Sequence, residues 1–210
     1  MRSLQEVSRP HLEGKEDPTV AYLPLASLLA EKWLEPTERA FRGLARVEVI
    51  DADKMDLPEM ESVIRRADLA YIPDGNAFLR SHRLYASRLI PYLRQKVQRG
   101  LPVVAFGAGA VACGPNVLTS MDLNMVPTAH FDGLQATPFS IHAHYEEGVE
   151  RDNWLAEYHT FHDNAVIMLE DGAYLKIEGK AAALVRGNAW CWRPGSEKER
   201  LTVGKSISAN

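Results

Sequence analysis

The stretch VVAFGAGAVACG, residues 103–114, decides the fold of this chain. Its apolar run stops at Gly107-Ala108-Gly109, and small residues then continue as the start of a helix. A strand, a tight glycine turn and a helix form the sharp elbow that presents a nucleophilic side chain in α/β hydrolases. The centre of such an elbow carries a hydroxyl or a thiol, whereas here it carries Gly107. The sequence therefore predicts an elbow that has no nucleophile.

Segments before the elbow alternate between strand and helix patterns. The expected strands are residues 19–27, 46–52, 69–73 and 102–106, and the expected helices are residues 28–44, 57–68 and 77–100, with Pro36 as a candidate break. Strands that alternate with helices of about a dozen residues predict an α/β fold with a doubly wound, mostly parallel sheet.

Beyond the elbow the pattern changes to loops and short strands, with one further helix at residues 151–162. Residues 165–195 form strands joined by tight turns, which either complete the sheet or form a small antiparallel flap. Residues 1–18 are polar and are expected to be a loosely packed arm. No linker divides the rest, so residues 19–210 are expected to form a single α/β domain.

Composition excludes several classes of function. The 210 residues are 46% hydrophobic and 25% charged, as in ordinary globular proteins, and the net charge of −4 disfavours nucleic-acid binding. No apolar run approaches the roughly 20 residues of a membrane-spanning helix, and the first residues lack the apolar core of a secretory signal. Two cysteines without paired spacing favour a cytoplasmic protein. We expect no metal and no cofactor.

Two loops that follow predicted strands are candidates for a site, residues 73–78 and 106–110. In open α/β sheets, ligands bind at the carboxyl ends of the strands. Glycines allow close approach of the backbone, and amides at the start of a helix stabilise an anion. Asp122 and His144 follow later in the chain, and the order nucleophile, acid, histidine is that of many α/β hydrolases.

These segments together resemble the serine peptidase family of dipeptidase E (α-aspartyl dipeptidase) and cyanophycinase. DGNAF, AFGAGAVACGPNV, MDLNMV, FDGLQATPFSIHAHY and ERDNWL follow one another in the family's order and at closely similar spacings. LEDG at residues 169–172 resembles a later strand and turn of the family. The resemblance covers most of the chain beyond residue 19. It implies a flavodoxin-like or class I glutamine amidotransferase-like three-layer sandwich.

The resemblance also assigns a catalytic role to four positions. Gly107 falls where the family has its nucleophilic serine, and His144 falls on its general base. Asp122 matches the acid associated with that histidine in the dipeptidases, and Glu170 matches the acid of the cyanophycinase-like arrangement. An acid of this kind orients the imidazole.

Further positions correspond to the family's oxyanion and binding residues. Gly75 and Asn76 fall in the Gly-Gly-Asn loop, and Ala108 follows the nucleophile, so its amide is an expected oxyanion donor. Asp74 replaces a glycine of that loop, and its charge would oppose the oxyanion of a tetrahedral intermediate. Arg151 matches an arginine near the family's pocket for acidic substrates.

The leading hypothesis is a dipeptidase E-like protein that lacks its nucleophile, natural or engineered, and is catalytically deficient. It retains a cleft for a small peptide or an acidic, amino-acid-like ligand. One alternative is a hydrolase of short aspartyl peptides, either the parent of an engineered variant or an enzyme that uses a water activated by His144. Another alternative is a non-enzymatic scaffold or partner subunit, and a homodimer is one expected assembly.

Other chemically interesting side chains have structural interpretations. Cys113 is expected to be a packed core thiol, and Thr119 and Ser120 are expected to make hydrogen bonds within a loop. The histidine pairs 142/144 and 159/162 have spacings that suit zinc, but no further ligand completes a motif. Trp190 and Trp192 are expected to pack from a strand. The basic helix of residues 77–100 is expected to present a solvated face.

Overall fold

The computed structural model describes residues 2–26 and 30–209. Residue 1, residues 27–29 and residue 210 lie outside the described residues. The first residue of the predicted arm, the end of the first predicted strand, the start of the first predicted helix and the last residue of the predicted domain are therefore not covered. The chain divides into two compact units. The first unit is Met1–Gly109 with Leu123–His130, and the second is Ala110–Asp122 with Phe131–Asn210. The sequence had predicted one domain, and each unit is described by itself below.

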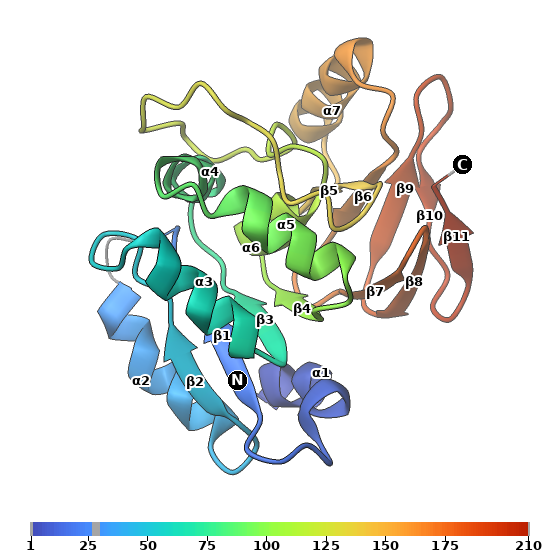
Figure 1. The fold of residues 1–210 in the computed structure, drawn as a ribbon. Helices are drawn as coiled ribbons and strands as arrows, with labels where there is room; N and C mark the ends of the chain where they lie inside the picture. Colours follow the sequence, from blue (N-terminus) through green and yellow to red (C-terminus); the bar gives the residue numbers. More distant parts are fainter. Residues whose placement is uncertain (1, 27–29, 210) are drawn as a thin grey trace. The chain divides into compact units, whose positions relative to one another are not determined.

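A four-stranded parallel sheet forms the centre of the first unit (Figure 1). Its strands are β1 (Thr19–Tyr22), β2 (Arg46–Val49), β3 (Leu69–Ile72) and β4 (Val103–Ala105), in the order β2-β1-β3-β4. The predicted strands and their parallel pairing are therefore confirmed, although each strand is shorter than expected. Every residue of β1 is buried, as expected of a central strand between two layers of helices.

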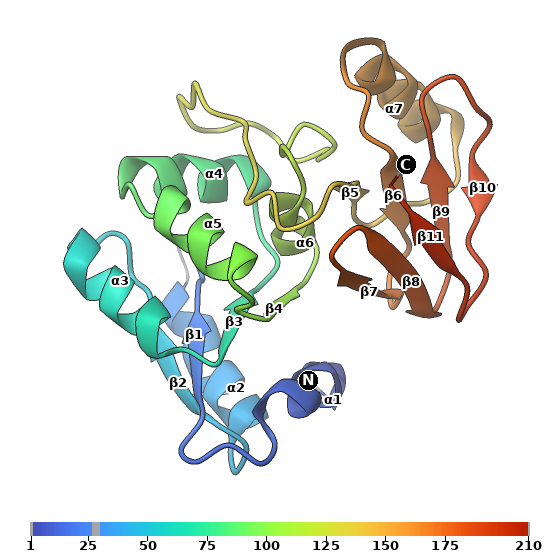
Figure 2. The ribbon, with the colours of Figure 1, turned by 45° about the vertical axis from the view of Figure 1, so that its right-hand side comes forward.

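The helices of the first unit cover both faces of this sheet (Figure 2). They are α1 (Arg2–Leu12), α2 (Ala30–Phe41), α3 (Leu57–Arg66), α4 (Ala77–Ala86) and α5 (Ile90–Gln98). Helices α1 and α2 contact each other, and α3 contacts α5. Asp56 and Glu59 form a reciprocal capping box at the start of α3. This unit therefore has the doubly wound arrangement that the alternating sequence pattern predicts.

Three local predictions in the first unit need correction. Residues 2–12 form helix α1 and not a loose arm, because Leu4, Val7 and Leu12 are buried against the rest of the unit. Helix α2 continues through Pro36. The predicted helix of residues 77–100 is two helices, since Arg88 adopts a left-handed φ of 58° that no continuous helix allows.

The second unit contains two further sheets (Figure 1). The first joins β5 (Ser140–His142), β6 (Val166–Leu169), β9 (Ala189–Trp192) and β10 (Glu199–Arg200) in the order β10-β9-β6-β5. Strands β5 and β6 are parallel, and the other pairs are antiparallel. The second is antiparallel and joins β7 (Tyr174–Glu178), β8 (Ala181–Arg186) and β11 (Ser206–Ser208). Helices α6 (Ala108–Cys113) and α7 (Val149–Phe161) complete the fold.

Alternating side chains of β6 and β9 build two cores in the second unit. Ile167 and Cys191 pack on the side of the three-stranded sheet with Ala182 of β8. Val166, Met168 and Trp190 pack on the side of α7, and Trp192 adds to that cluster. The alternation follows from the two-residue period of a strand. The structure thus agrees with the interpretation of both tryptophans as packing residues.

Candidate functional site

The structure places the predicted elbow between β4 and α6. Strand β4 ends at Ala105, Gly107 has a left-handed φ of 50°, and α6 starts at Ala108. A side chain is strained in this conformation unless the surroundings support it, as they do in a nucleophile elbow. The amide of Phe106 donates to Ile72 O at 3.0 Å, which holds the elbow against the end of β3.

The loop after β3 brings Asp74 to the elbow. One oxygen of its carboxylate, Oδ1, accepts hydrogen bonds from the amides of Gly75 and Ala108, both at 2.8 Å. These are the two amides that the sequence analysis expected to serve as oxyanion donors. Both donors therefore bind a carboxylate of the chain itself.

The Asp74 carboxylate also fills the space beside Gly107. A Cβ added to Gly107 would overlap Asp74 Oδ1 and Cγ and would lie 2.6 Å from Oδ2. Such distances are shorter than those real Cβ atoms make, so something would have to shift. A side chain at position 107 and the observed position of Asp74 are therefore mutually exclusive.

Two polar residues hold the Asp74 loop in place. Asn76 caps α4, because its Oδ1 accepts from Leu79 N at 2.9 Å and its Nδ2 donates to Leu123 O at 2.9 Å. Arg80 is 1% exposed, and its guanidinium donates to Pro73 O. A buried charged donor of this kind fixes the backbone from which Asp74 extends.

His144 lies in the second unit, after β5, with a left-handed φ of 56°. A non-glycine residue in this conformation is uncommon and is enriched at functional sites. Its Nδ1 lies 2.6 Å from Asp171 Oδ1, and the two side chains are 53% and 83% exposed. Asp171 follows β6, the strand that pairs with β5. This pair has the arrangement in which a carboxylate orients an imidazole.

Of the two acids predicted to orient His144, Glu170 has a side-chain contact with another residue. The Glu170 carboxylate accepts from Asn188 Nδ2 at 2.7 Å. The backbone amide of Asp122 donates to Ser120 Oγ at 3.1 Å, so the role of the Asp122 carboxylate stays a prediction. Asp171, which the sequence analysis did not name, makes the hydrogen bond to His144. The LEDG segment contains both acids in succession, and the sequence alone did not indicate which one points to the histidine.

Arg151 and Asp152, in the first turn of α7, contact the segment that carries His144. Arg151 Nη1 donates to His144 O at 2.7 Å, and Nη2 lies 3.6 Å from Glu146 Oε2. Tyr145 OH donates to Asp152 Oδ1 at 2.8 Å. The arginine that was predicted to line the pocket therefore makes a hydrogen bond to the backbone of His144.

Lys198 completes this polar cluster. Its Nζ lies 2.6 Å from Asp152 Oδ2, 2.8 Å from Tyr145 OH and 3.2 Å from Glu147 Oε1. Partial burial acts to lower the pKa of Lys198, but these hydrogen bonds outweigh it and raise the pKa well above its usual value. Burial also raises the pKa of Tyr145. Both groups therefore keep their protons at neutral pH.

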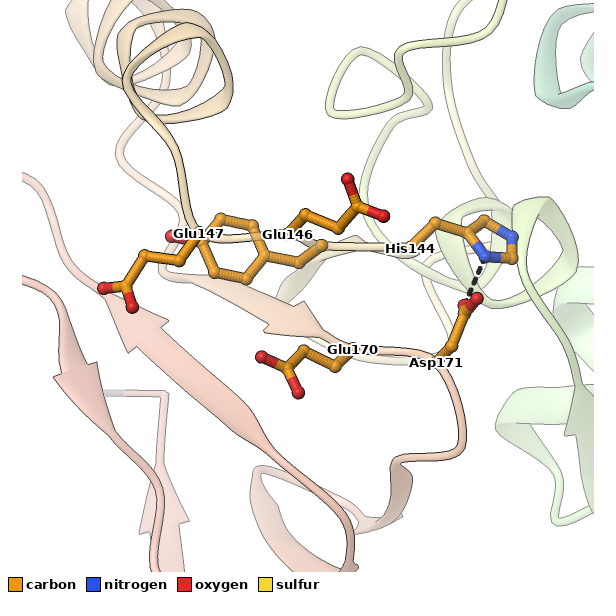
Figure 3. Close-up of a pocket in the computed structure, with 6 residues that line it drawn as sticks. His144, Glu146, Glu147, Glu170 and Asp171 are labelled. Carbon is orange, nitrogen blue, oxygen red and sulfur yellow. Dashed lines mark hydrogen bonds and ion pairs between the residues drawn. The ribbon is translucent and has the colours of Figure 1, made fainter.

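A hollow of about 320 Å³ lies beside His144 and is rich in acidic side chains (Figure 3). Figure 3 shows His144 and Asp171 facing each other, while Glu146, Glu147 and Glu170 point in other directions. The hollow is lined by His144, Tyr145, Glu146, Glu147, Glu170 and Asp171. The lining contains four carboxylates, of which Glu146 lies near Arg151 and Glu147 near Lys198. The remaining negative charge favours neutral or positively charged groups.

The remaining candidates are structural. His142 is buried, and its Nδ1 donates to Thr119 O at 2.6 Å. Burial lowers the pKa of His142 and that of His159. Thr119 Oγ1 donates to Ile141 O at 2.6 Å, so it serves the loop as expected. Within residues 2–26 and 30–209, no group of three or more potential ligands is placed to hold a metal ion.

No helix among the described residues is long and apolar enough to cross a membrane.

Comparison with known proteins gives the family. A model of peptidase family S51 matches residues 4–185 of this chain. The chain belongs to the peptidase S51 family. Among curated relatives, peptidase E of Streptomyces coelicolor is 28% identical over 215 residues, covering 95% of this chain and 88% of the relative. Peptidase E of Nostoc sp. is 26% identical over 198 residues, covering 89% and 80%.

Solved structures of two peptidases have the same fold. A peptidase from an acI-B1 actinobacterium superposes with a TM-score of 0.76 at 18% identity, covering 99% of this chain and 92% of that one. A putative peptidase E from Listeria monocytogenes superposes with a TM-score of 0.65 at 20% identity, covering 94% and 93%. The predicted mixed α/β fold with a parallel sheet is therefore confirmed, and its flavodoxin-like layering agrees with these neighbours.

Proposed function

We propose that this protein is a peptidase E-like S51 family member that lacks the serine nucleophile and does not form an acyl-enzyme. It retains a pocket beside His144 for a small peptide or an amino-acid-like ligand. The observation that carries the proposal is the position of the Asp74 carboxylate, which fills the space beside Gly107 and accepts from Gly75 N and Ala108 N.

Two physical consequences of this position support catalytic deficiency. A glycine offers no oxygen to attack a carbonyl, and the Asp74 carboxylate in its observed position occupies the space that a side chain at position 107 would take. An oxyanion hole stabilises a transition state only if its donors are available to the developing charge. Here both amides bind Asp74 Oδ1, whose negative charge would repel an oxyanion in the same place.

The fit between Asp74 and Gly107 favours a natural substitution over an engineered one. An engineered exchange of serine for glycine removes a side chain and leaves its space empty. In this chain the space is filled by a carboxylate that makes two hydrogen bonds of its own. Asp74, which stands where the family has a loop glycine, thus fills the space that the missing serine side chain would occupy at position 107. We infer that the two positions changed together.

Turnover by the purified protein tests the proposal. We expect no hydrolysis of the aspartyl dipeptide Asp-Leu and no mass increase at Gly107 or elsewhere after treatment with a fluorophosphonate. The doubly substituted variant Gly107→Ser/Asp74→Gly serves as the matched control, because it supplies a hydroxyl and frees both amides. Hydrolysis of Asp-Leu by the unsubstituted chain, blocked by the fluorophosphonate, would overturn the proposal.

The His144–Asp171 pair supports a second candidate function, hydrolysis by an activated water. With Nδ1 bonded to Asp171, Nε2 is the nitrogen that would take a proton from water as the oxygen attacks the carbonyl. The imidazolium would then return the proton to the leaving amine. General-base catalysis contributes about 10²–10⁴-fold, far less than a full covalent mechanism. Slow hydrolysis that persists after fluorophosphonate treatment and is lost in His144→Gln would establish this function.

The charge of the hollow bears on its ligand. Four acidic residues are among those that line the space beside His144, and Arg151 is bound to the His144 carbonyl and lies near Glu146. We therefore expect a neutral or basic short peptide to bind more tightly than the acidic ligand that the resemblance implies. Calorimetric titration with Ala-Leu and Asp-Leu measures this preference. If neither these nor other short peptides bind, the scaffold interpretation replaces the ligand-binding one.

A further inference from the structure

We propose that Arg151 is a positioning residue, which holds His144 in its left-handed conformation, and that it does not bind a ligand carboxylate. The inference rests on the proposed role of His144 as the functional side chain of the hollow. It reassigns the arginine that the family resemblance places near a pocket for acidic substrates.

The backbone of His144 requires support. A φ of 56° places the Cβ of a non-glycine residue close to the following carbonyl oxygen, which costs free energy. Such a residue persists only where its surroundings fix it. The conformation also sets the direction of the imidazole. Its Nδ1 makes a hydrogen bond to Asp171, which lies in the turn after β6.

Arg151 supplies that support directly. Its Nη1 donates to His144 O at 2.7 Å, so it binds the backbone of the residue that has the left-handed φ. A charged donor makes a stronger hydrogen bond to a carbonyl than a neutral donor does. The Arg151 side chain is 27% exposed, and Glu146 Oε2 lies 3.6 Å from Nη2. Its charge is thus partly balanced within the protein.

Tyr145, the next residue along the chain, is also fixed by hydrogen bonds. Tyr145 is 1% exposed, its amide donates to Leu169 O at 2.9 Å, and its hydroxyl donates to Asp152. Lys198 bonds to both Asp152 and Tyr145. Consecutive residues of one helical turn, Arg151 and Asp152, therefore fix consecutive residues of the loop. With Tyr145 anchored, the hydrogen bond from Arg151 determines the conformation of His144.

Nuclear magnetic resonance of the histidine ring nitrogens tests the inference without depending on enzymatic activity. In the unsubstituted chain, we expect a downfield Nδ1 proton for His144, as a short hydrogen bond to a carboxylate gives. Arg151→Met should lose this signal, Asp171→Asn should lose it as the positive control, and Arg151→Lys should restore it in part. Lys180→Met removes an equal charge from an exposed turn and should leave the signal unchanged.

Ligand binding separates the two roles of Arg151. If it positions His144, Arg151→Met changes the affinities for Asp-Leu and Ala-Leu by the same factor. If it binds a ligand carboxylate, the affinity for Asp-Leu falls selectively, by about tenfold or more, the usual loss of a charged hydrogen bond. The selective fall, or an unchanged His144 signal in folded Arg151→Met, would overturn the inference. If the protein proves to hydrolyse Asp-Leu, the proposed lack of turnover is wrong. The His144 proton signal and the two affinities still test the role of Arg151.

Discussion

The carboxylate of Asp74 lies where a side chain at position 107 would lie. A Cβ on Gly107 would overlap Asp74 Oδ1, and that oxygen accepts hydrogen bonds from the amides of Gly75 and Ala108. The elbow of this S51 family member is therefore filled by a group from the neighbouring loop. The space, the charge and the donors that a serine mechanism needs are all affected by this one contact.

Restoring the serine alone should destabilise the protein. In Gly107→Ser, the new side chain meets the Asp74 carboxylate, and φ at this position is left-handed. We expect the free energy of unfolding to fall by about 1–3 kcal/mol, from steric overlap and backbone strain. Urea unfolding followed by circular dichroism measures the change. Unchanged stability would show that Asp74 moves aside at little cost.

A double-mutant cycle should reveal coupling between the two positions. Asp74→Gly alone loses two hydrogen bonds, but in the presence of Gly107→Ser it also removes the overlap. The double variant should be more stable than the sum of the single effects by about 1–2 kcal/mol. A matched cycle of Gly107→Ser with Asp163→Gly, at an exposed aspartate of the second unit, should be additive within about 0.5 kcal/mol.

Acid should destabilise the fold through two histidines, the buried His142 and the partly buried His159. Burial lowers the pKa of His142 and His159 below the usual histidine value of about 6.5, so the unfolded chain takes up protons first as the pH falls. The stability that the neutral histidines contribute is therefore fully present above pH 6.5. It falls as the pH drops below 6.5, by up to about 1.4 kcal/mol per pH unit for each histidine.

The variant His142→Asn isolates one of these contributions. The asparagine amide can still donate to Thr119 O but does not titrate. Its free energy of unfolding should depend less on pH between 6.5 and 5.5 than that of the unsubstituted chain. Urea titrations at the two pH values measure the free energy of unfolding of both proteins. An equal loss of stability between pH 6.5 and 5.5 in both would contradict the role of His142.

Neutralising the hollow should change its preference for charge. In Glu146→Gln/Glu147→Gln, two of the four carboxylates that line the hollow are lost. The affinity for Asp-Leu relative to Ala-Leu should rise by about twofold to fivefold at low salt, and less at 0.5 M salt because exposed charges are screened. Glu150→Gln/Glu157→Gln, at two exposed positions on α7, removes the same two charges and serves as the control for net charge. An unchanged ratio would show that the ligand binds elsewhere.

Local features of the fold were predictable from the sequence because local chemistry determines them. The elbow follows from an apolar run that ends at Gly107-Ala108-Gly109, and the parallel strands follow from strands that alternate with helices. The start of α3 follows from Asp56 and Glu59 at capping-box spacing. Helix α1 escaped prediction, because its buried leucines and valine are separated by polar residues and its role depends on what it packs against.

The sequence supplied candidate residues for the site but not their contacts. His144, Asp74 and Ala108 were identified from motif order, yet their partners depend on loop conformations. The sequence indicated that Asp74 carries the wrong charge for an oxyanion loop. It did not show that the carboxylate points at Gly107 and binds Ala108 N. The choice of Asp171 over Glu170 likewise depends on which side chain of a turn faces the histidine.

The amide proton of Ala108 provides the most direct test of the central claim, that the Asp74 carboxylate fills the elbow. Ala108 is 34 residues from Asp74 in the chain, so its amide responds to that side chain only through space. In the unsubstituted protein its resonance should lie downfield, as in a hydrogen bond to a carboxylate, and should move markedly upfield in Asp74→Ala. An Ala108 resonance at the same position in both folded proteins would contradict the account.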